Sequence, residues 1–272
     1  MPMRLVLVAG LLATTGLLFW IVAQDEPPLY LVCGGLVLGL LAVTVGVVAV
    51  AHRLPALGHR RRAHALAREG VALLEQDRPT AARERFEEAA QLYRGLEAWH
   101  AMAIHNVAVA LLAEGELDRA IDLLEAVVAS GWPRSFSFLQ RRGHVELALA
   151  FALALAGDVD RAERSLREGA AHWRRRPGWM FVAEAAIAAR RERWAEAARF
   201  ERDWAIAERD LDARRRRTLR VLLAYLLARG GAKEASDRWI ASIHPLPLAP
   251  LLPLSARWPE LRDFLAGHGV AG

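Results

Sequence analysis

The stretch GELDRAIDLLEAVV, residues 115–128, decides the fold of this chain. After Gly115 it places a small residue at Ala120, a large apolar residue four positions later at Leu124, and a further apolar residue at Val127. Residues spaced three and four apart lie on one face of an α-helix. We therefore predict a helix over this stretch, with a second helix crossing closely over Ala120.

The same spacing of small and large residues recurs along the chain, each time after a break rich in Gly, Pro or Asp. It is found in residues 78–93, 157–170 and 230–243, where the last segment places Ala235 and Trp239 at the small and large positions. Residues 192–205 match less well, because Glu201 stands where the large apolar residue is expected. With almost no strand pattern between these segments, we predict an all-α fold built from helix pairs.

Residues 106–128, NVAVALLAEGELDRAIDLLEAVV, resemble the tetratricopeptide-repeat family, and residues 148–166 are the next closest stretch. The family's glycine before the second helix of each repeat stands here as Gly115, Gly157 and Gly230. The resemblance implies an α-solenoid of about five helix pairs over residues 63–243, with a concave groove. Residues 244–272 are rich in proline, and we expect a capping helix to begin at Pro259.

The resemblance also implies that the first helix of each pair lines the groove. The residues placed there are mostly apolar, with a few imidazoles, and this composition suits an amphipathic helix or an extended peptide. The partner-groove candidates are Met102, His105, Asn106, Val109, Leu112, His144, Leu147, Phe151, Trp179 and Val182. The alternative is that the C-terminal segment, or lengthened helices, fill the groove from within.

Two apolar runs precede the repeats, at residues 5–23 and 29–51, and each is as long as the roughly 20 residues that a membrane-spanning helix needs. Only QDEPPL separates them, so we predict a two-helix membrane hairpin over residues 1–52. A basic linker follows at residues 53–62, whereas the hairpin loop contains no Lys or Arg. Positive residues favour the cytoplasmic side, which predicts a bacterial inner-membrane protein with both termini and the repeats in the cytoplasm.

Small residues four apart in the second apolar run allow a close approach of another helix: Gly35, Gly39, Ala42 and Gly46. The first apolar run is available as their partner. The alternative is a homo-oligomer through Gly35 and Gly39, or docking on another membrane protein.

The sequence offers no recognisable catalytic or cofactor chemistry. Phosphate-binding, nucleophile-elbow, zinc-protease and C-x-x-C motifs do not occur, and Cys33 is the only cysteine. We expect no enzyme activity, no cofactor and no metal site. The run Arg214–Arg217 is interpreted as the solvated start of a helix, and since acidic residues flank it we expect no nucleic acid to bind.

Together these patterns favour a membrane-anchored cytoplasmic scaffold or adaptor that binds protein partners at the inner face of a bacterial membrane. The alternative is a dedicated subunit or assembly factor of a membrane complex for secretion, motility or envelope synthesis. In that case the Gly-rich hairpin, and not the groove, carries the main contact.

Overall fold

The computed structural model describes residues 58–94, 97–130, 136–243 and 249–269, together with Trp20, Gly39, Leu41, Thr44 and Val45. The chain divides into two compact units, residues 1–61 and 62–272.

Most of the predicted membrane hairpin lies outside the described residues, including Gly35, Ala42 and Gly46. The five isolated residues described in the first unit are all helical. In the part of the chain that the structure describes, no helix combines the length and the apolar character needed to cross a bilayer.

The second unit is all-α over its described residues, as predicted, with helices joined by turns and without a strand. Residues 58–75 form the first helix of the stack. The helices and short 3-10 turns that follow are α3 Pro79–Leu92, α4 Glu97–Glu114, α5 Leu117–Ala129, α6 Phe136–Ala156, α7 Val159–Ala170, α8 Met180–Arg190, η1 Trp194–Glu196, α9 Ala197–Arg209, α10 Ala213–Arg229, α11 Lys233–Ala241, η2 Ala249–Ser255 and α12 Pro259–Gly267.

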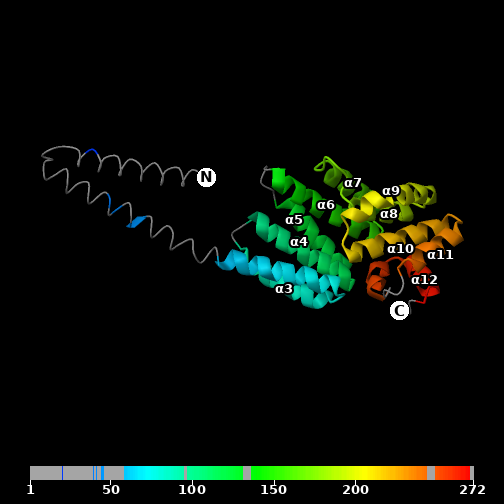
Figure 1. Ribbon diagram of the computed structural model, residues 1–272, viewed down its shortest axis with the longest axis horizontal. Helices are drawn as coiled ribbons and strands as arrows, with labels where there is room; N and C mark the ends of the chain where they lie inside the picture. Colours follow the sequence, from blue (N-terminus) through cyan, green and yellow to red (C-terminus); the bar gives the residue numbers. More distant parts are fainter. Residues whose placement is uncertain are drawn as a thin grey trace. The chain divides into compact units, whose positions relative to one another are not determined.

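The helices pack in chain order, as Figure 1 shows for the coloured series from α3 to α11. α4 packs on α5, α6 on α7 and α10 on α11, so these helices form pairs. The first helices of successive pairs also touch, α4 with α6, α6 with α8, and α8 with α10. The 58–75 helix, α4, α6, α8 and α10 are called the inner helices below.

Five turns of one kind join the two helices of each pair. In each, one residue has a positive φ: Asp77, Gly115, Gly157, Glu192 or Gly231. The N–H of the next residue donates to the carbonyl five positions before it, with N···O distances of 2.8 to 3.0 Å. This bond satisfies a carbonyl at the helix end, and glycine suits the position because it lacks a Cβ. The position predicted for the glycine of the last turn was wrong by one residue, since Gly231 and not Gly230 has the left-handed conformation.

The small residues of the repeated pattern lie five positions after these turn residues. Ala82, Ala120 and Ala162 are fully buried, which confirms the close crossing predicted at Ala120. In the last pair Ser236 and Ile240 are buried, and not the predicted Ala235 and Trp239. The register of that helix is therefore one residue later than the sequence suggested, as the turn at Gly231 requires.

Glu201, the exception in the pattern, has a polar partner. Its carboxylate accepts a hydrogen bond from the indole N–H of Trp239, at 2.8 Å. Trp239 also packs edge-on against Trp204, with the ring centroids 4.8 Å apart. The fourth and fifth pairs thus join through an indole and a carboxylate, where other pairs use a large apolar side chain.

Candidate binding pocket

The stack closes on itself through a salt bridge between the first turn and α10. An Nη of Arg217 lies 2.7 Å from a carboxylate oxygen of Asp77, 140 residues earlier in the chain. The Arg217 side chain is only 5% exposed, so this contact is largely shielded from water. Such a pair is costly to break from one side, because a buried charge then loses its partner.

The C-terminal segment also packs on the inner helices. η2 contacts α4, and Leu251, Leu254, Leu261 and Leu265 meet side chains of α6 and α10. We expected this segment to cap the edge of the last repeat. The predicted helix at Pro259 is confirmed as α12, and it touches the last pair, since Phe264 packs on Tyr225 of α10 and His268 lies 3.7 Å from Asp237 of α11. The segment also covers part of the inner face, where its leucines find apolar partners.

Arg190 fastens this segment to the end of α6. Its guanidinium donates to the carbonyls of Ala154 at 3.0 Å and Leu155 at 2.6 Å, which are in the last turn of α6. It also donates to the carbonyl of Arg257 at 2.8 Å and lies over the ring of Trp258, 4.1 Å from the centroid. One side chain thus satisfies helix-end carbonyls and holds the segment in place.

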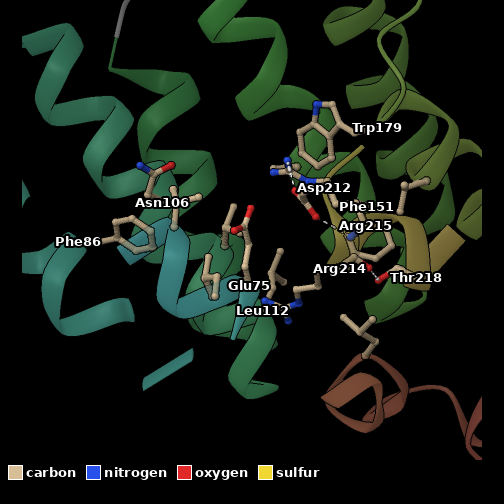
Figure 2. A pocket seen from close by; sticks show the side chains of 16 residues that line it. Glu75, Phe86, Asn106, Leu112, Phe151, Trp179, Asp212, Arg214, Arg215 and Thr218 are labelled. Carbon is tan, nitrogen blue, oxygen red and sulfur yellow. Dashed lines mark hydrogen bonds and ion pairs between the residues drawn. The ribbon is translucent and has the colours of Figure 1, made fainter. Parts of the chain in front are cut away.

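A cavity of about 160 Å³ remains between the inner helices, beside the part of the inner face that the C-terminal segment covers. Its walls come from the first helix, α3, α4, α6, α8, α10 and η2, and Figure 2 shows the side chains that surround it. Most of the wall is apolar: Val71, Leu74, Phe86, Val109, Leu112, Ala148, Phe151, Trp179, Val182 and Leu254. The polar residues are Glu75, Asn106, Asp212, Arg214, Arg215 and Thr218.

The polar side of the cavity is built around the start of α10. Asp212 caps this helix, since its carboxylate accepts the backbone N–H of Arg215 at 2.7 Å and also pairs with the Arg215 guanidinium at 2.8 Å. The same guanidinium lies 4.7 Å from the centroid of the Trp179 ring. Asp212 and Arg215 therefore neutralise each other, and Arg215 is held against an aromatic face.

Two histidines lie beside the cavity on the inner helices. His105 of α4 is 5% exposed, and burial together with the nearby His144 and Arg215 lowers its pKa from 6.5 to about 3. His144 of α6 accepts the indole N–H of Trp179 on Nδ1 at 3.0 Å. Burial, with Arg215 and Arg141 nearby, lowers the pKa of His144 to about 4. Both imidazoles are neutral at pH 7, so Arg215 and Arg214 are the cations on this side.

The structure brings six of the ten partner-groove candidates into the cavity wall: Asn106, Val109, Leu112, Phe151, Trp179 and Val182. Met102, His105, His144 and Leu147 are not in the wall. Leu147 is fully buried in the core, and the Nδ1–H of His105 donates to the side-chain oxygen of Asn106 at 3.2 Å.

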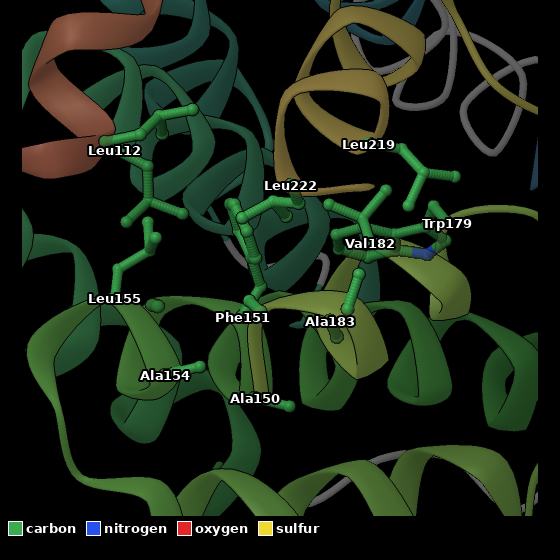
Figure 3. Close-up of a cluster of buried hydrophobic side chains, with 14 of the residues drawn as sticks. Leu112, Ala150, Phe151, Ala154, Leu155, Trp179, Val182, Ala183, Leu219 and Leu222 are labelled. Atoms are coloured by element: carbon green, nitrogen blue, oxygen red, sulfur yellow. The ribbon is translucent and has the colours of Figure 1, made fainter. Parts of the chain in front are cut away.

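Phe151 has a second role that the sequence did not indicate. Figure 3 shows it among the buried side chains of the inner helices, near Leu222 of α10 and Val182 of α8. Only 7% of Phe151 is exposed, so it belongs to the core as well as to the cavity wall. Shortening it therefore affects folding as well as the cavity.

Sequence reasoning missed the contributions of the first pair and of α10. The interpretation of Arg214–Arg217 as a helix start is confirmed by α10, but its description as solvated was wrong for Arg217. Arg217 is buried against Asp77, and Arg214 and Arg215 line the cavity. The helix dipole disfavours cations at the start of a helix, so a run of four arginines there was the signal that could have indicated a role for them.

Comparison of the chain with protein-family models, with curated proteins and with solved structures gives no match.

Proposed function

We propose that this protein is a membrane-anchored scaffold whose tetratricopeptide-like repeats hold one apolar anchor of a protein partner in the cavity of the inner helices. The observation that carries the proposal is the cavity itself, about 160 Å³ with mostly apolar walls. Interiors rarely leave such space unfilled, and apolar pockets of this kind are the usual place for a binding anchor.

The size of the cavity limits what the partner inserts. The C-terminal segment already covers the inner face beside it, through Leu251, Leu261 and Leu265. An extended groove for a long peptide is therefore replaced by a site for about one side chain. The partner's remaining contacts fall on the rim, where Val71 is 47% exposed.

Membrane attachment is the second part of the proposal. Leu41 and Val45 are helical, lie four residues apart, and are 62% and 54% exposed, so they present an apolar face without protein cover. Together with the two apolar runs, this supports an anchor that lies in lipid. An alkaline phosphatase fusion after Gly272 should be inactive and a green fluorescent protein fusion should be bright; the reverse pattern contradicts cytoplasmic repeats.

Site-specific photo-crosslinking in the intact chain tests the binding site. A photoreactive phenylalanine replaces Val71 at the cavity rim or, as the control, Ile206 on α9, which is 50% exposed and is not part of the cavity wall. The proposal predicts a defined protein adduct from position 71 in native membranes and none of the same mass from position 206. Equal adducts from both positions, or none from position 71, contradict it.

A further inference from the structure

One arginine of the cavity wall forms no ion pair with the residues that the structure describes. Of its four charged residues, Asp212 and Arg215 pair with each other, which leaves Arg214 and Glu75. The Arg214 guanidinium makes no ion pair or hydrogen bond among the residues that the structure describes. Glu75 is exposed, so water solvates its charge at the mouth.

The acids nearest to Arg214 already have other partners. Asp77 and Asp212 are the carboxylates that act on it electrostatically, and they bind Arg217 and Arg215. Burial is the largest influence on this guanidinium and lowers its pKa below its ordinary value. Arg214 is also in the first turn of α10, where the positive end of the helix dipole opposes a cation. An anion bound in the cavity would offset both burial and the helix dipole.

We infer that the ligand group of this cavity is a monocarboxylate attached to an apolar body about the size of one ring, with the carboxylate bound by Arg214. A guanidinium binds a carboxylate through two parallel N–H···O bonds, and one arginine matches one negative charge. The apolar walls from Phe86, Val109 and Phe151 suit the body of the ligand. An apolar cavity of similar volume is known to hold a benzene ring.

The inference rests on the proposed function in one respect, because it assigns the chemistry of the same cavity. An acidic residue beside an apolar anchor of the partner would supply this group, and so would a free aromatic or branched carboxylate. Both sources offer the same carboxylate and apolar body to the cavity, and competition with the crosslink separates them.

The direct test measures binding of 4-fluorophenylacetate to the full-length protein by fluorine NMR, with the isosteric neutral 4-fluorophenylacetamide as the comparison. We expect the carboxylate to bind at least about tenfold more tightly than the amide, as hydrogen bonds to charged groups provide. Arg214→Gln should remove about tenfold of the carboxylate's affinity and leave the amide's unchanged. Arg216→Gln, with the same charge change on the same helix but outside the cavity wall, should change neither.

Stability separates a ligand-binding role of Arg214 from a structural one. Since burial and the helix dipole both disfavour the Arg214 cation, Arg214→Gln should leave the melting temperature unchanged or raise it. A melting temperature lowered by several degrees would mean that Arg214 supports the fold, and it would overturn the inference. Equal binding of the acid and the amide, or equal effects of the two arginine substitutions, would also overturn it.

The effect of the probe on the crosslink at position 71 shows whether the partner or a small molecule supplies the carboxylate. If 4-fluorophenylacetate reduces the protein adduct while the amide does not, the partner supplies the acidic group. If the probe binds through Arg214 but no adduct forms, a small carboxylate is the ligand, and the proposed function fails while the inference stands. If the adduct forms but the probe does not bind, the inference fails and the proposed function stands.

Discussion

Lowering the pH from 7 to 5 should destabilise the repeat unit through His105 and His144. Both are neutral in the folded chain, with pKa values of about 3 and about 4, whereas an imidazole in the unfolded chain has its ordinary value of 6.5. Between these values the unfolded state binds more protons than the folded state. The stabilising effect is therefore complete above pH 6.5 and is lost as the pH falls.

The size of the effect follows from the two shifts. One pKa unit corresponds to about 1.4 kcal/mol, so each histidine should cost roughly 2 kcal/mol between pH 7 and pH 5, or about 4 kcal/mol together. For a unit of this size that corresponds to a melting temperature lower by roughly 10 °C. Protonation of His144 on Nδ1 also removes the acceptor of the Trp179 indole, which acts in the same direction.

Thermal melts monitored by circular dichroism across this pH range provide the assay. The double substitution His105→Gln and His144→Gln should flatten the pH dependence, and glutamine can still accept the Trp179 hydrogen bond. His59→Gln, at an exposed position, should leave the dependence as in the wild type. A wild-type melt that is constant from pH 7 to 5, or a double variant with the full dependence, would refute the reasoning.

Three further substitutions test the closure and the turns of the stack. Asp77→Asn keeps a residue that tolerates positive φ but leaves Arg217 charged and buried, so the free energy of unfolding measured in urea should fall by about 3 kcal/mol. An unchanged free energy of unfolding would contradict closure of the stack through Asp77 and Arg217. Glu192→Gly should raise the free energy of unfolding by roughly 1 kcal/mol, because glycine is unstrained at positive φ, and a decrease would contradict the turn geometry. Trp258→Ala should lower the free energy of unfolding by about 3 kcal/mol and expose the C-terminal segment, so trypsin should cut first in that segment. An unchanged digest would mean that Arg190 and Trp258 do not hold the segment in place.

The helix pairs were predictable because they depend on local spacing. Ala120, Leu124 and Val127 fall on one face whatever surrounds them, and a glycine after a helix marks its end. The last turn was placed one residue early because Gly230 and Gly231 are adjacent and only the hydrogen bond from Ala232 to Leu227 chooses between them. Asp77 and Glu192 carried no signal, since neither is a glycine.

The cavity was predictable only in part because it needs the stack to close. Asn106, Val109 and Phe151 follow from which helices face inward. Arg214 enters the wall only when Arg217, three residues later, meets Asp77 on the first turn, and no spacing within 140 residues encodes that meeting. The filling of the inner face by Leu251 and Leu254 likewise depends on the path of a proline-rich segment.

Filling the cavity from within tests the central claim most directly. Val109 is half-buried and lines the cavity, so Val109→Trp should occupy the space that the partner's anchor needs. Val128→Trp on α5, half-buried but outside the cavity wall, is the matched control. The measurement is the yield of the protein adduct from the photoreactive residue at position 71. We expect Val109→Trp to lower this yield about tenfold with the melting temperature retained, and Val128→Trp to leave the yield unchanged. An undiminished yield from the Val109→Trp chain would show that the partner does not use the cavity.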